Sequence, residues 1–172
     1  MGQNNLNLGC GYEYIDGWIN VDLYTKSDIK RDLNKIPWKL GKDRYDEVKM
    51  INVMEHLDIS FYDCMHQIYF LSKKNALVEI EVPYCHSQSA NSPEHIHRGY
   101  NLNAFETLCL NIDQNSIFKG KIIRKDMIPS RFGKLIPRIP IHIGDCNNLR
   151  DIFAILFNEI YTHIHVWIKI EK

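Results

Sequence analysis

A glycine pair directly after a short apolar run limits how the first part of this chain can fold. Leu6–Leu8 has the character of a β-strand, and it runs into Gly9-Cys10-Gly11. Glycine has no Cβ, so such a turn can bring backbone N–H groups close to a ligand that lies over the end of the strand. Glycine pairs after apolar runs are also common as ordinary turns, and the pair alone does not separate the two interpretations.

An acidic residue near the end of the next predicted strand favours a ligand. This strand covers 18–23 and carries Asp22. The carboxyl ends of neighbouring parallel strands line one crevice, so the Asp22 carboxylate is expected to face the ribose of a bound nucleoside. A dinucleotide-binding loop would have a third glycine, where this chain has Tyr14, and an acid about 20 residues on. Asp22 follows Gly11 by only 11 residues, which leaves little room for a helix and favours a nucleoside without a diphosphate.

Hydrophobic periodicity predicts alternating strands and helices in the rest of the chain. Further strands are predicted over 29–33, 45–52, 76–82, 116–124 and 163–170, and helices over 59–71, 103–112 and 149–161. The segment 127–148 contains three prolines and is predicted to be a loop-rich insertion. This order predicts one α/β domain over 1–172, with a doubly wound, mostly parallel sheet and an antiparallel C-terminal strand.

Composition and charge narrow the functional class. The 21 Lys+Arg and 21 Asp+Glu residues balance, so no basic field indicates nucleic acid as a partner. The five cysteines are odd in number and form no C-x-x-C pair, which is typical of reduced thiols and predicts a cytoplasmic protein. No apolar run approaches the roughly 20 residues of a transmembrane helix. The sequence does not fix the oligomeric state, and a homo-oligomer is compatible with it.

Four motifs in order carry a resemblance to a known family. They are Leu6–Gly11, then Gly17–Asp22, then Asp32-Leu33 with Pro37-Trp38, and then the stretch from Asp46 to Leu57. Together they resemble the type 11 group of class I S-adenosylmethionine-dependent methyltransferases, over positions 6–83. This resemblance implies a Rossmann-like methyltransferase fold, S-adenosylmethionine as the cofactor, a cofactor-binding half over 6–83 and an acceptor-side half over 84–172.

The resemblance also implies where the cofactor would lie. Gly9, Cys10 and Gly11 should approach its methionine part, Asp22 its ribose, and Asp32 with the Leu33 backbone its adenine. Asn52 and Val53 should border the methionine part from the fourth strand. The full set of cofactor-binding residues that follows is Asn7, Gly9, Cys10, Gly11, Asp22, Leu23, Asp32, Leu33, Asn52 and Val53. The chain departs from its relatives at Ser72–Ala76, where Asn75 can still adopt the left-handed conformation of a turn.

Two histidines are the candidate catalytic residues. Methyl transfer to a hydroxyl needs a group that removes a proton, and His56 follows the strand where the reacting methyl should lie. His95, in the loop after the strand 76–82, occupies the place of an acceptor-side histidine in the resemblance. Alternatively, Glu55-His56 only caps the following helix or orients the loop. A loop could also bring His86, His95 and His97 onto a metal ion, although no metal is expected.

The second half contains two further features with open interpretations. His163 and His165 share one side of the last predicted strand with Trp167, which indicates a solvated or interface surface. The segment 132–143 carries isoleucines beside Arg131, Lys134 and Arg138, so it could bind an anionic or lipid-linked acceptor or touch a membrane surface. Its prolines favour packing over the sheet edge or against a second subunit instead.

The sequence thus predicts transfer of a methyl group to an oxygen, or to a nitrogen, of a small-molecule or glycan acceptor. Two alternatives remain. A nicotinamide-dependent oxidoreductase would share the sheet and the glycine turn but lacks the third glycine here. A catalytically silent, methyltransferase-like partner subunit would keep the fold without turnover.

Overall fold

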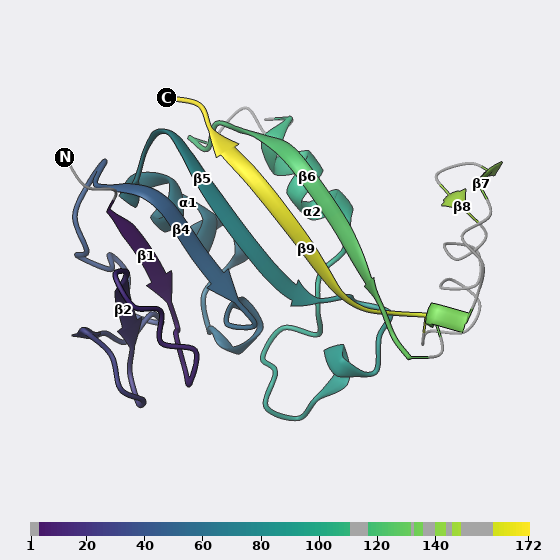
Figure 1. The fold of residues 1–172 in the computed structure, drawn as a ribbon, viewed down its shortest axis with the longest axis horizontal. Coiled ribbons are helices and arrows are strands. Elements are labelled where there is room, and N and C mark those ends of the chain that lie inside the picture. Colours follow the sequence, from purple (N-terminus) through teal and green to yellow (C-terminus); the bar gives the residue numbers. More distant parts are fainter. Residues whose placement is uncertain (1–3, 111–116, 132, 136–139, 144–145, 149–159) are drawn as a thin grey trace.

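The computed structural model describes most of the chain (Figure 1). The described residues are 4–110, 117–131, 133–135, 140–143, 146–148 and 160–172. None of the helices in these ranges is long and apolar enough to cross a membrane. Four of the five cysteines, Cys10, Cys64, Cys85 and Cys109, are unpaired thiols.

One seven-stranded sheet organises the fold, in the order β3-β2-β1-β4-β5-β9-β6. The first five strands along the chain are parallel to one another, whereas β9 runs antiparallel between β5 and β6. The predicted mostly parallel sheet with an antiparallel C-terminal strand is therefore confirmed. The strands are β1 (Asn5–Leu8), β2 (Ile19–Asp22), β3 (Ile29–Lys30), β4 (Tyr45–Ile51), β5 (Ser72–Pro83), β6 (Gly120–Pro129) and β9 (Tyr161–Ile170).

Two α-helices cover one face of this sheet (Figure 1). Helix α1 (Phe61–Leu71) begins after Ser60, whose side chain accepts a hydrogen bond from the Asp63 N–H at 3.0 Å. Helix α2 (Leu102–Cys109) begins in the same way after Asn101. The apolar side chains of both helices join the strand residues in one core. Three short 3-10 helices complete the described structure: η1 (Met54–His56), η2 (Ser89–Asn91) and η3 (Gly133–Leu135).

The opposite face of the sheet is polar. Strands β4, β5 and β9 alternate buried apolar residues with partly exposed polar ones, a pattern typical of a sheet with one dry face. On the polar side, Lys49 pairs with Glu79 at 3.0 Å. His165 lies between Glu79 and Glu81, at 2.8 and 3.3 Å, and stacks on Trp167. The residues 9–18 and 23–28, which connect β1 to β2 and β2 to β3, contain no helix that could cover this face.

A buried polar network holds the connection between β1 and β2 in place of a helix. The Asn20 side chain is fully buried, donates to the Ile15 carbonyl at 2.9 Å and accepts from the Ile15 N–H at 2.9 Å. Asn7 donates to Asn20 Oδ1 at 3.0 Å and to the Glu13 carbonyl at 2.9 Å. Asp28 in turn accepts from the Asn20 backbone N–H at 2.7 Å. These bonds fix the course of the chain between the glycine pair and β2.

The structure corrects two predicted boundaries in the second half. The strand predicted over 116–124 begins at Gly120 and continues to Pro129, because it pairs with β9 from Gly120–Ile170 to Pro129–Tyr161. The loop-rich insertion predicted over 127–148 therefore begins later, and it contains the antiparallel pair β7 (Pro140–Ile143) and β8 (Cys146–Asn148).

Other predictions fall at the limits of the described residues. The helix predicted over 149–161 lies outside them up to 159, and Tyr161 already belongs to β9. The cationic segment around 132–143 lies partly outside them as well, at 132 and 136–139, and of its cations Arg131 and Lys134 are exposed. Asn75 does adopt the predicted left-handed conformation, with φ 65°, inside an irregularity of the β4–β5 pairing.

The Asn20 network gives a test of how this fold is stabilised. We expect Asn20→Ala to lower the free energy of unfolding by at least about 2 kcal/mol, because it leaves several buried groups without hydrogen bonds. Urea denaturation measures the change. Asn91→Ala is the matched control at an exposed position, where a change within about 0.5 kcal/mol is expected. Equal losses in the two variants would show that the network does not stabilise the fold.

Candidate functional site

The glycine pair forms the floor of the candidate site. Gly9 and Gly11 both have positive φ, at 64° and 52°, a conformation that other residues adopt only with strain. A Cβ on Gly9 would lie 2.5 Å from Cγ2 of Val53, which follows β4. Gly9 is therefore required by the close approach of two neighbouring strand ends.

Asp22, at the end of β2, is held by backbone donors. Its Oδ2 accepts from the Gly11 N–H at 2.9 Å, and its Oδ1 accepts from the N–H groups of Tyr24 and Thr25 at 2.7 and 2.8 Å. Burial alone would raise the pKa of Asp22, but these hydrogen bonds outweigh it and lower the pKa. The carboxylate is thus ionised at neutral pH. Since each carboxylate oxygen has about two acceptor positions, one on Oδ2 is still open to a ligand.

A cavity of about 430 Å³ lies over these groups at the carboxyl ends of β1, β2 and β4. It brings together most of the residues that the sequence singled out as cofactor-binding, and His56 lies on its wall. The predicted residues that line it are Gly9, Gly11, Asp22, Leu23, Asp32, Leu33, Asn52, Val53 and His56.

Three predicted residues do not line this cavity. Asn7 belongs to the buried network beneath the loop. The Cys10 side chain is buried, and its backbone N–H donates to the Val21 carbonyl at 3.0 Å, so that donor faces the sheet. The ring of His95 packs against that of His56 instead. For all of the predicted residues, including those that line the cavity, a role in binding or catalysis stays a prediction.

The cavity also has walls that the sequence did not indicate: Tyr24, Arg31, Asn34 and Leu57. Arg31 directly precedes Asp32, and its Nε is buried without a hydrogen-bond partner. The sequence did contain a signal for Arg31, because this cation stands next to Asp32, the residue predicted to lie by the adenine. Asn34 lies there because its Oδ1 accepts from the Asp58 N–H at 2.6 Å, a contact between distant segments.

Hydrogen bonds between two segments hold His95 against His56. The Glu55 carbonyl accepts from the N–H groups of Ile96 and His97, at 2.9 and 3.0 Å, and so ties η1 to the loop after β5. The rings of His56 and His95 meet edge to face with centroids 4.7 Å apart. The two predicted catalytic residues are therefore brought together at the edge of the cavity.

The side chain of Glu55 lies beneath this histidine pair and is 1% exposed. Burial raises the pKa of Glu55, and neither the backbone hydrogen bond nor His56 offsets it fully. Its Oε2 has no hydrogen-bond partner. The structure does not show Glu55-His56 capping the following helix, because Ser60 caps α1. The other half of that alternative, in which the pair orients the loop, agrees with the hydrogen bonds from Ile96 and His97 to the Glu55 carbonyl.

The predicted alternative of a metal on His86, His95 and His97 has no support in the described part of the chain. His97 Nε2 lies 3.0 Å from the Ile59 carbonyl, and the His86 ring packs against Tyr84. The group that the structure does gather is Glu55, His56 and His95.

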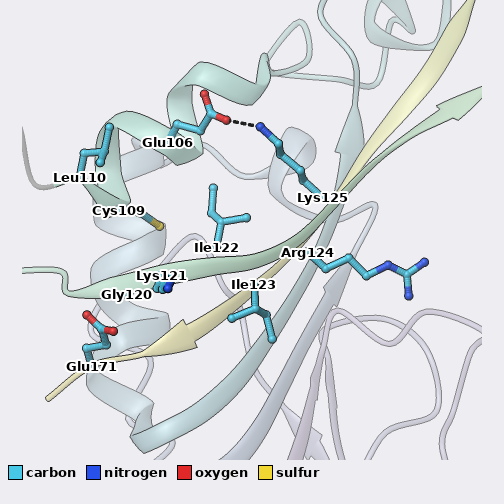
Figure 2. Close-up of a pocket in the computed structure, with 10 residues that line it drawn as sticks. All are labelled: Glu106, Cys109, Leu110, Gly120, Lys121, Ile122, Ile123, Arg124, Lys125 and Glu171. Atoms are coloured by element: carbon cyan, nitrogen blue, oxygen red, sulfur yellow. Dashed lines mark hydrogen bonds and ion pairs between the residues drawn. The ribbon is translucent and has the colours of Figure 1, made fainter. Parts of the chain in front are cut away.

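A second cavity of about 740 Å³ lies between α2 and β6, as Figure 2 shows. Its walls include Ile122, Ile123 and the ion pair Glu106–Lys125 at 2.6 Å. Burial raises the pKa of the Cys109 thiol to about 11, so this thiol is protonated at neutral pH. The lining residues thus offer no ready nucleophile. The candidate site is the smaller cavity over the glycine loop.

Comparisons with solved structures support the fold described above. No family model and no curated protein sequence matches the chain. Among solved structures, it is similar to an S-adenosylmethionine-dependent methyltransferase from Archaeoglobus fulgidus, with a TM-score of 0.63 at 15% identity. The similarity covers 97% of this chain and 86% of that one.

Two further structures are similar. An S-adenosylmethionine-dependent methyltransferase from Mesorhizobium loti gives a TM-score of 0.61 at 10% identity, over 98% of this chain and 91% of that one. Phosphoethanolamine N-methyltransferase 2 from Haemonchus contortus, in complex with S-adenosyl-L-methionine, gives 0.58 at 13% identity, over 99% of this chain and 49% of that one. The chain therefore has the Rossmann-like fold of the class I S-adenosylmethionine-dependent methyltransferases, as the motif series predicted.

The contact between Gly9 and Val53 can be tested by substitution. We expect Gly9→Ala to destabilise the protein by at least about 1 kcal/mol more than Gly17→Ala, because it adds overpacking to the backbone strain. Gly17 is the matched control, with φ 80° and open space around it. Val53→Ala should recover part of the loss in the Gly9→Ala background. Urea denaturation that gives equal losses for the two glycine variants would contradict the close approach.

Glu55 gives a test of pH dependence. Its folded-state pKa is raised, so its favourable contribution is present below the unfolded value of about 4.5 and is lost as the pH rises through the folded value. Glu55→Gln removes this loss. We expect its melting temperature in metal-free buffer to exceed that of the wild type by more at pH 8 than at pH 5. At pH 8 its free energy of unfolding should be higher than that of the wild type by on the order of 1–2 kcal/mol. A difference independent of pH would show that Glu55 is not a buried acid.

Proposed function

We propose that the protein transfers a methyl group from S-adenosylmethionine to an oxygen of a small-molecule or glycan acceptor. A nitrogen acceptor is less favoured. The observation that carries the proposal is the cavity at the strand ends, which has the ionised Asp22 on one wall and His56 on another. The fold supports the same cofactor, because the similar structures include a methyltransferase with S-adenosyl-L-methionine bound.

In this proposal the cofactor follows the cavity from Asp32 to His56. Adenine lies by Asp32 and the Leu33 backbone, and a ribose hydroxyl donates to the open acceptor position of Asp22. The methionine part passes Gly9 and Val53. The sulfonium methyl then points toward the histidine pair.

The reaction itself is a displacement at the methyl carbon. An acceptor oxygen forms the new C–O bond while the C–S bond breaks, and its electron pair stays on sulfur to give S-adenosylhomocysteine. The acceptor hydroxyl must lose a proton, which His56 or His95 can take because both lie at the acceptor side of the cavity. The site contributes mainly by orienting the two reactants.

Two different observations disfavour the oxidoreductase and the silent partner subunit. A dinucleotide places its pyrophosphate on a helix N-terminus after the first strand, whereas residues 9–18 contain no helix. This observation disfavours a nicotinamide-dependent oxidoreductase. A catalytically silent partner subunit would bind the cofactor without turnover, and the histidine pair beside the cavity favours an active enzyme over it. The unpaired cysteines support the cytoplasm as the compartment that we propose.

Calorimetry with S-adenosylhomocysteine tests this proposal. We expect one nucleoside per chain, bound more tightly than NAD, and an affinity at least tenfold lower in Asp22→Asn because a charge-assisted hydrogen bond is lost. Asp16→Asn, at an exposed position outside the cavity, should leave the affinity unchanged. Transfer of a labelled methyl group to a panel of hydroxylated acceptors should follow. Folded protein that binds neither S-adenosylmethionine nor its product would refute the proposal, and binding without transfer to any acceptor would favour the silent subunit.

A further inference from the structure

Three side chains with metal-binding atoms meet at the acceptor side of the cavity. Glu55 and His56 come from η1 after β4, and His95 comes from the loop after β5. One ligand atom from each lies within 4.8 Å of the other two. The sequence did not indicate this group, because it placed the histidines of one loop together instead.

The hydrogen bonds around His56 leave one ring nitrogen free to bind a cation. Its Nδ1 lies 3.2 Å from the Glu94 carbonyl, which can only accept, so this contact is a hydrogen bond in the tautomer with the proton on Nδ1. In that tautomer Nε2, which lies 4.0 Å from Glu55 Oε1, has its lone pair available to a metal. Metal-binding histidines commonly donate their other N–H to a backbone carbonyl in this way.

Two buried atoms in the cluster have no partner. Oε2 of Glu55, on a side chain that is 1% exposed, and Nδ1 of His95 are both buried without a hydrogen bond. A buried polar atom without a partner costs about 1–3 kcal/mol, and a bound ion is one of its common explanations. The unsatisfied atoms belong to the same group as the free His56 nitrogen, which points to a shared cationic ligand.

We propose that Glu55, His56 and His95 bind a divalent transition-metal ion, with Zn²⁺ as the best match. Two imidazoles and one carboxylate are the ligand set of many catalytic zinc sites, which keep a further position open. Ligands at about 2.0–2.2 Å from zinc lie about 3.4 Å apart in a tetrahedron, so the cluster closes by roughly 1 Å on binding. His56 is 41% exposed and can supply this movement. Mg²⁺ is a poor match because it prefers oxygen ligands.

The use of this ion rests on the proposed methyl transfer, although the site itself is argued from its side chains alone. The open position faces the acceptor side of the cavity, where a hydroxyl can bind the metal. Metal binding lowers the pKa of such a hydroxyl, and its proton goes to water. A metal held there would supply an activated acceptor oxygen for attack on the methyl carbon, with the C–S bond breaking as in the proposed transfer. In the metal-bound protein the two histidines are therefore ligands, and they do not themselves take the proton.

Metal titration of the chelator-treated, full-length protein tests the site directly. We expect calorimetry to give one Zn²⁺ per chain, and Co²⁺ to give visible absorption bands of a four-coordinate ion. Glu55→Gln, His56→Gln and His95→Gln should each weaken Zn²⁺ binding at least tenfold. His66→Gln is the matched control, because His66 also has a buried ring nitrogen without a partner but lies on α1 outside the cluster. It should bind Zn²⁺ as the wild type does.

The outcomes separate this site from the proposed function. The metal site is overturned if Zn²⁺ does not bind, if the three variants bind it as well as His66→Gln does, or if Mg²⁺ binds more tightly. S-adenosylhomocysteine is titrated into the same samples. Nucleoside binding without Zn²⁺ binding leaves the proposed function standing and removes the metal. Zn²⁺ binding that the three variants weaken, in a protein without nucleoside affinity, supports the metal site and removes the proposed function.

Discussion

The buried contact between Asn7 and Asn20 is the interaction on which the site depends. The chain returns from β1 to β2 without a helix, so the packing that normally holds a crossover between parallel strands is missing there. The two asparagines replace it with hydrogen bonds to the backbone at Ile15 and Glu13. This fixes the glycine pair against Val53 and presents the Gly11 N–H to Asp22. A polar network thereby holds a connection that contains no helix.

Sequence patterns predicted the first half of the fold well, because its signals are local. The glycine pair, the short step to Asp22 and the position of Asn52 each follow from a strand and the turn after it. The start of β6 could not be predicted in this way. Residues 117–129 carry no regular alternation of apolar and polar residues, and only the pairing with β9 decides which of them belong to the sheet. The β7–β8 pair was missed because its three- and four-residue strands carry no clear period.

The two sides of the candidate site also differ in whether local sequence signals predict them. The nucleoside side is made of strand ends, which sequence motifs locate. The acceptor side is made of contacts between segments about 40 residues apart, such as the bonds from Ile96 and His97 to the Glu55 carbonyl. The sequence identified His56 and His95 one at a time. No local pattern distinguishes Glu55, directly before His56, from a solvated glutamate, so the burial of its side chain beneath both histidines could not be predicted.

The polar face of the sheet has a consequence for how the strands align. Since side chains alternate with a period of two, a slip of one residue in β5 would turn Glu79 and Glu81 into the core and bring Val78 and Ile80 out to solvent. In a sheet covered by helices on both faces, such a slip exchanges one apolar residue for another. Here a slip of one residue in a central strand buries charge. The polar face therefore excludes the one-residue slips in the alignment of the strand ends that form the cavity.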